Sequence, residues 1–159
     1  MRTGNYRRRL FAVALVVAVF WGAFPAVSPG AGSPEEIQKK RTALMKKISK
    51  TMRLIRVYAK KSQMNDLAGA ALDVAKLVDR ILELSPEGSA FGPKSRIEPE
   101  VWKEFDRYNK LTGKTSAAAR SLAKVAGAGD GESLMPSFTS LAKTCRACHK
   151  PFRKKKKRK

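Results

Sequence analysis

The stretch PEEIQKKRTALMKKISKTMRLIRVYAK, residues 34–60, carries a strong helical pattern. Its apolar side chains recur every three or four residues, which places them on one face of an α-helix. These residues are Ile37, Leu44, Met45, Ile48, Met52 and Ile55. Ser33 is a suitable N-cap, Pro34 fits the first helical position, and Glu35 and Glu36 suit the positive end of the helix dipole. The pattern predicts a long amphipathic helix whose apolar stripe must be buried against other elements.

Three further segments towards the C-terminus have the same periodicity, at about residues 65–84, 99–126 and 132–152. No segment alternates with period two, as a half-buried strand would. Turn-forming residues separate the segments at 85–88 and 127–131. The predicted inward positions are Leu67, Ala70, Ala71, Val74, Leu77, Val78, Ile81 and Leu84; Val101, Phe105, Tyr108, Thr112, Thr115, Ala119, Leu122 and Ala126; and Leu134, Phe138, Leu141, Cys145, Cys148 and Phe152. Four such helices predict an all-α, antiparallel up-down-up-down four-helix bundle.

The first thirty residues have the features of an export segment. Arg7, Arg8 and Arg9 precede an uncharged apolar run over residues 10–27, and small, turn-forming residues follow it. This order is typical of a secretory signal peptide over residues 1–30. An uncleaved membrane anchor is the alternative, because the apolar run is near the lower limit for a membrane span. We therefore expect a periplasmic domain at residues 31–152, followed by a basic tail at 153–159.

The composition narrows the class of protein. The chain has 159 residues, 34 of them lysine or arginine and 13 aspartate or glutamate, for a formal net charge of +21. This length allows one ordinary domain. Residues 153–159 are seven bases in a row, the first thirty residues hold four arginines, and residues 31–152 retain a net charge of +10. Two cysteines and one histidine exclude a disulfide framework and a zinc site made of four Cys and His ligands.

Both cysteines and the single histidine fall within five residues, Cys145-Arg-Ala-Cys148-His149. On a helix the spacings i, i+3 and i+4 share one face. Two thiols on that face can form thioethers with the vinyl groups on one porphyrin edge, and the imidazole can then reach the iron. C-x-x-C-H is the signature of c-type haem attachment. A redox C-x-x-C, a zinc site with a carboxylate ligand, and a structural histidine are weaker alternatives, since the motif ends a helix in an all-helical chain.

Taken together, these features make the sequence resemble the cytochrome c′ / cytochrome c-556 family. The resemblance covers roughly residues 34–153 and rests on four pieces. They are RTALMK at 41–46, SPEGS at 85–89 followed by PEVW at 99–102, AGD at 128–130 with Cys145 fifteen residues beyond Asp130, and the C-terminal C-x-x-C-H-x-x-F-R at 145–153. One departure is the spacing from Trp102 to Phe105, which is shorter than is usual in the family.

The resemblance implies one haem c, attached covalently through Cys145 and Cys148. His149 would be the proximal axial ligand through Nε2, and Met45 matches the distal position over the iron. A coordinating thioether there would make the iron six-coordinate and low-spin, which suits electron transfer, and haem iron accepts such a ligand. Methionine on an inward helix face is also an ordinary core residue, and a non-coordinating Met45 would leave a five-coordinate iron.

The resemblance also implies residues around the haem. Arg41 interrupts the apolar stripe of the first helix, where burying an unpaired charge would be costly. It matches a family arginine that lies near a haem propionate. Arg153 matches the arginine beside the proximal histidine. Thr42 is a further expected haem contact, and Trp102 is expected either to pack in the core or to contact the haem.

Two functions follow as expectations. The first is an exported mono-haem electron carrier, not an enzyme, with His149 and Met45 as iron ligands. The alternative is a five-coordinate, high-spin protein that binds nitric oxide or carbon monoxide. The basic body favours acidic redox partners, and the tail is expected to be either a flexible solvated segment or one that contacts an anionic membrane surface or an acidic partner. The resemblance implies that a homodimer, where one forms, would use the first two helices, while nucleic acid is not an expected partner of an exported chain.

Overall fold

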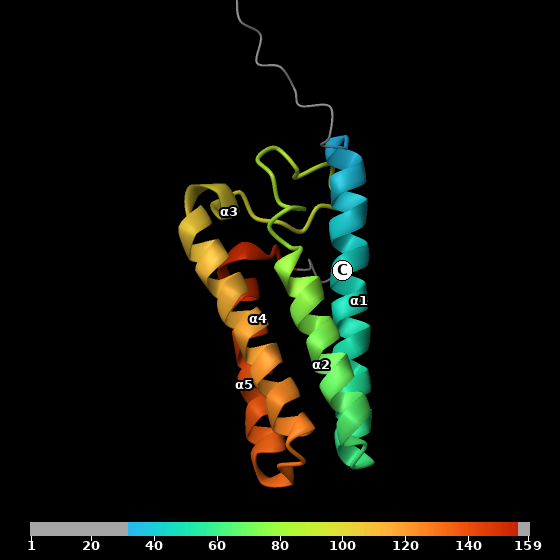
Figure 1. The fold of residues 1–159 in the computed structure, drawn as a ribbon. Helices are drawn as coiled ribbons and strands as arrows, with labels where there is room; N and C mark the ends of the chain where they lie inside the picture. The colour runs from blue at the N-terminus through green and yellow to red at the C-terminus, as the bar shows by residue number, and fades with distance from the viewer. Residues whose placement is uncertain (1–31, 156–159) are drawn as a thin grey trace, which may run out of the picture.

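A computed structural model describes residues 32–155, which fold into a bundle of helices (Figure 1). Its elements are α1 (Pro34–Lys60), α2 (Met64–Asp79), α3 (Glu100–Lys103), α4 (Phe105–Gly127) and α5 (Gly131–Phe152). The expected export segment at 1–30 lies outside the described residues, so it stays a prediction. No helix within residues 32–155 combines the length and apolar character needed to cross a membrane.

The four long helices alternate in direction, so the predicted bundle is confirmed (Figure 1). α1 packs along α2, α2 along α4, and α4 along α5, while the single-turn α3 touches α4 and α5. Among the described residues, α1 and α5 share no comparable contact. α1 and α5 therefore lack the close backbone packing that joins the other neighbouring long helices.

α1 begins at the predicted residue because its first turn is capped locally. Ser33 Oγ accepts a hydrogen bond from the Glu36 amide at 3.3 Å, and Glu36 Oε2 accepts one from the Ser33 amide at 3.0 Å. This reciprocal capping box satisfies two amides that the helix cannot pair internally. The helix ends in a short turn at Ser62, whose φ is 56°, and the chain reverses into α2.

Replacing Ser33 with alanine should lower the free energy of unfolding by about 1 kcal/mol, the usual cost of losing a serine N-cap. Urea unfolding followed by circular dichroism would measure it. Ser49→Ala, at an exposed position inside the same helix, is the matched control and should be neutral or slightly stabilising, because alanine is the better helix former. Equal losses in the two variants would contradict the capping role.

The core contains most of the residues on the predicted stripes, and three details differ. α2 ends at Asp79, and the turns that follow still bury Ile81. The predicted third helix is broken at Glu104, whose φ and ψ of −118° and 43° are not helical. In a continuous helix Phe105 would share a face with buried Val101 and Tyr108, but the break turns it outward, and it is 41% exposed.

Candidate functional site

The C-x-x-C-H motif occupies the last turns of α5, where all three functional side chains are half-buried. Cys145 and Cys148 are free thiols, and both pack against the hydrophobic core. Cys145 and Cys148 are three residues apart and His149 follows directly, so all three residues lie at neighbouring positions on one helix face, as predicted. The helix ends at Phe152, and Arg153 leaves it in an extended conformation.

Burial favours the neutral form of all three groups in this motif. Burial raises the pKa of the Cys145 thiol. Burial and the neighbouring Cys145 raise the pKa of Cys148 to about 11, so both groups are neutral thiols at neutral pH. Burial lowers the pKa of His149, and the nearby positive charges of Arg153 and Arg96 lower it further. A neutral imidazole has a nitrogen lone pair, which an iron ligand requires.

Arg41 lies on the inner side of α1 and is only 7% exposed. Its guanidinium donates to the carbonyl oxygen of Leu84 at 2.7 Å, to Ser89 Oγ at 2.8 Å and to the Ser89 carbonyl oxygen at 2.8 Å. These bonds use three of the five N–H donors of an arginine side chain. Burial lowers the pKa of Arg41, but a guanidinium stays charged in proteins.

No salt bridge between described residues includes Arg41. A buried charge is normally paired, and the surrounding oxygen atoms of Leu84 and Ser89 are neutral. Arg41 therefore has the features expected of a partner for an anionic group such as a haem propionate. The residues present in the structure therefore suit a bound haem.

The other predicted contacts have different environments. Met45, one turn beyond Arg41, is half-buried and packs against the core. Trp102 is also half-buried, and its Nε1 donates to the Ser85 carbonyl oxygen at 3.1 Å. Thr42 is exposed in the described structure. The alternating helix directions bring the N-terminal half of α1 and the C-terminal end of α5 to the same end of the bundle (Figure 1).

From its sequence, the segment between α2 and α3 is expected to be a linker, yet in the structure it supplies most of the polar atoms around Arg41 and Trp102. Ser85 and Ser89 are fully buried. Ser85 Oγ lies 3.1 Å from the Tyr108 hydroxyl, and the Tyr108 ring meets Phe152 edge-on, with centroids 5.2 Å apart. The only signal in the sequence was the SPEGS string, which reads as a helix breaker and does not reveal its partners.

The same segment also holds the end of α5. Ile97 forms an isolated antiparallel bridge with Arg153. The Glu98 amide donates to the Phe152 carbonyl oxygen at 3.0 Å, and the Lys154 amide donates to the Arg96 carbonyl oxygen at 2.9 Å. Residues 84–98 thus contact Arg41 of α1 near their N-terminal end. Near their C-terminal end they contact residues 152–154, which follow the C-x-x-C-H motif. They join the two helices that do not pack on each other.

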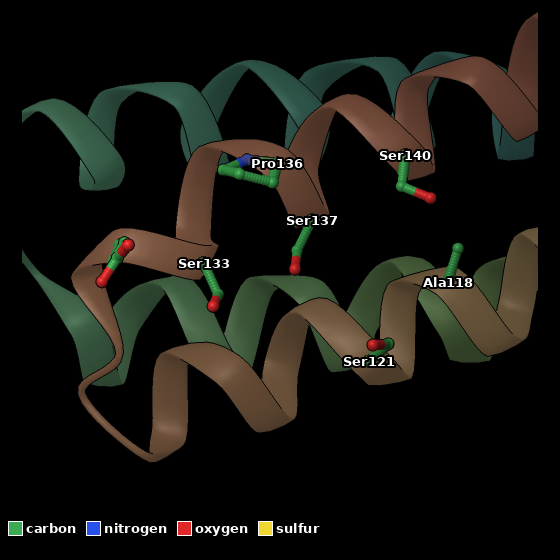
Figure 2. Close-up of a pocket in the computed structure, with 7 residues that line it drawn as sticks. Ala118, Ser121, Ser133, Pro136, Ser137 and Ser140 are labelled. Atoms are coloured by element: carbon green, nitrogen blue, oxygen red, sulfur yellow. The ribbon is translucent and has the colours of Figure 1, made fainter.

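A separate cavity of about 440 Å³ lies between α4 and α5 (Figure 2). Ser133 and Ser137 extend from α5 towards α4 across it (Figure 2). Its remaining lining residues are Ala118, Ser121, Glu132, Pro136 and Ser140. No residue of the C-x-x-C-H motif lines this cavity, so it is not part of the haem site.

A four-helix bundle with a C-terminal C-x-x-C-H motif defines the class of helical-bundle c-type haem proteins. A family model described as Cytochrome C′ matches residues 36–153. The chain therefore belongs to the cytochrome c′ family. Its cofactor is one covalently attached haem c.

Individual relatives agree with the family match. The cytochrome c′ of Rhodospirillum rubrum is 26% identical over 141 residues, which cover 87% of this chain and 96% of that protein. A solved cytochrome c′ described as having an unusual ligand-controlled dimer dissociation is 25% identical, with a TM-score of 0.72, and the match covers 79% of this chain and 99% of that one. A nitric oxide complex of a cytochrome c′ variant from Alcaligenes xylosoxidans, 20% identical, has the same fold, with a TM-score of 0.70 and 79% and 99% coverage.

Proposed function

We propose that this chain is an exported haem c protein that binds a small diatomic gas, such as nitric oxide or carbon monoxide, at its iron. The observation that carries the proposal is the family match over residues 36–153. It is supported by the nitric oxide complex reported for a protein of the same fold. When bound, the haem supplies the iron to which such a gas can bind.

The chain's own residues would hold and orient that group. Cys145 and Cys148 would form the two thioethers, and His149 would supply the proximal nitrogen through Nε2. Arg41 would pair with a propionate, which provides the counter-charge that its neutral partners lack. Trp102 and Thr42 would lie at the edge of the site, and Arg153 beside the proximal histidine.

A second candidate function is electron transfer, with Met45 as the distal ligand of a low-spin iron. The observation that favours it is the position of Met45, half-buried and one turn from Arg41. A thioether on haem iron raises its reduction potential, which suits an electron carrier.

Absorption spectra of the purified protein, oxidised and reduced, with and without carbon monoxide, separate these functions. For gas binding we expect a high-spin ferrous form that binds carbon monoxide readily. Met45→Ala should leave the spin state unchanged and alter the carbon monoxide affinity by less than about tenfold, or 1.4 kcal/mol. Met52→Ala, at a half-buried position two turns away on α1, is the matched control. A low-spin protein that becomes high-spin only in Met45→Ala would establish the electron carrier instead.

The location and assembly of the protein are part of the proposal. Residues 1–30 would direct export and be removed or kept as an anchor, residues 31–152 would form the periplasmic domain, and residues 153–159 would be a basic tail that can contact an anionic membrane surface. Reversible homodimerisation is a further proposal, supported by the dimer named for the solved relative.

A further inference from the structure

The positive charge of the helical domain is concentrated on one helix. Between Lys39 and Lys61 there are ten lysines and arginines and no acidic residue. Residues 34–61 carry a net charge of +8, out of +10 for residues 31–152. The adjacent α2 carries three aspartates and one lysine, so it is negative. α1 therefore carries the largest positive excess in the domain, and α4 carries a smaller one of +4.

Five of these charges lie along one face on the outside of the bundle. Lys39, Lys46, Lys50, Arg53 and Lys60 are spaced by seven, four, three and seven residues, which places them on one helix face. All five are exposed, and they lie opposite the buried stripe of α1. At 1.5 Å per residue, this face, which we call the lysine face, is about 32 Å long.

Within residues 32–155, few acidic side chains neutralise the charges of the lysine face. Lys39 pairs with Glu35 at 2.9 Å, and both side chains are exposed. No other residue of the face forms a salt bridge with a described residue. Like charges at spacings of three and four residues destabilise a helix by a few tenths of a kcal/mol per pair. The arrangement therefore opposes the stability of α1 and indicates a use outside the folded domain.

Two apolar side chains on α1 indicate what kind of surface meets this face. Leu54 and Val57 are 39% and 42% exposed, and they follow Arg53 on the outer side of the helix. Their spacing of three residues makes them neighbours. Exposed apolar side chains beside charged ones are a feature of protein–protein interfaces. A single helix face is too small for a permanent complex and suits a transient one.

We propose that the lysine face of α1 is the docking surface for the acidic face of a partner protein. The other side of the same helix carries Arg41 and Met45, so the partner would dock on the helix that lines the proposed haem site. Complementary charge would accelerate the encounter and make it sensitive to ionic strength. This docking does not depend on whether the iron binds gas or carries electrons.

The test compares two charge reversals of equal size in the full-length holoprotein. One variant combines Lys46→Glu, Lys50→Glu and Arg53→Glu on the lysine face. The control combines Lys110→Glu, Lys114→Glu and Lys124→Glu, at exposed positions of α4. The probe is poly-L-glutamate, an acidic polypeptide, titrated at low and high ionic strength.

We expect the α1 variant to lose at least about tenfold in affinity at low salt, and the α4 control to lose less than about threefold. Both losses in affinity should become smaller at high salt, because salt shortens the Debye length. Haem absorption and carbon monoxide binding, measured on the same samples, should be unchanged, which separates this test from that of the proposed function. If the reversed helix folds poorly, the glutamine variants Lys46→Gln, Lys50→Gln and Arg53→Gln should show a smaller loss in the same order.

Three results would overturn the proposal. Equal losses in the α1 and α4 variants would mean that only the total charge matters. Tighter α1-dependent binding to vesicles containing 30 mol% phosphatidylglycerol than to the polypeptide would assign the face to a membrane. A change in self-association by sedimentation, with no change in polypeptide binding, would assign it to a second copy of the chain.

Discussion

A variant with Cys145→Ser and Cys148→Ser is expected to contain no covalently bound haem. Serine preserves the shape of each side chain but cannot form the thioether. The two thiols are the only cysteines in the chain, so no other residue can replace them. Haem staining after denaturing electrophoresis and the intact mass of the protein would both measure the loss, which should be complete.

The controls separate attachment from folding. The single variant Cys145→Ser should retain covalent haem through Cys148, with an altered pyridine haemochrome spectrum. Ser140→Ala, at an exposed position on the same helix, should behave as the unchanged protein. The double variant should also unfold at lower urea concentration, because it lacks the bound haem and because α1 and α5 do not pack closely on each other. Persistent haem staining of the double variant would contradict the assigned attachment.

Replacing Arg41 with methionine should lower the free energy of unfolding by on the order of 3 kcal/mol or more. The substitution keeps a long apolar stem and a good helix former, but it leaves two carbonyl oxygens and Ser89 Oγ without their donor. Buried acceptors without a partner carry the full cost of desolvation. Urea unfolding of the holoprotein would measure the effect.

Lys40→Met is the matched control, because it removes the same charge from an exposed neighbouring position, and it should cost less than about 0.5 kcal/mol. Ser89→Ala removes only one of the three acceptors and should cost about 1 kcal/mol. If Arg41→Met were as stable as Lys40→Met, the segment at residues 84–98 would not depend on the guanidinium. Arg41→Lys should recover part of the loss, since an ammonium can reach fewer of the same oxygens.

Elements whose signals lie within one or two turns were predicted well from the sequence. α1 starts and ends where its pattern predicts, because the Ser33 capping box and the apolar stripe are local features. The same holds for α5, where the C-x-x-C-H spacing already places three functional groups on one face. The third helix was predicted less well, since the break at Glu104 that exposes Phe105 has no strong local signal.

By itself, the sequence determined the helical periodicity, the clustering of charge on α1 and the chemistry of the C-x-x-C-H motif, because each depends on residues close together in the chain. Only the tertiary structure decided which oxygens surround Arg41, since its partners Leu84 and Ser89 are 43 and 48 residues away. It alone also shows that residues 84–98 join α1 to the end of α5. Most of these contacts have a backbone amide or carbonyl as at least one partner, and every residue carries those groups, so the residue types in the sequence do not reveal them.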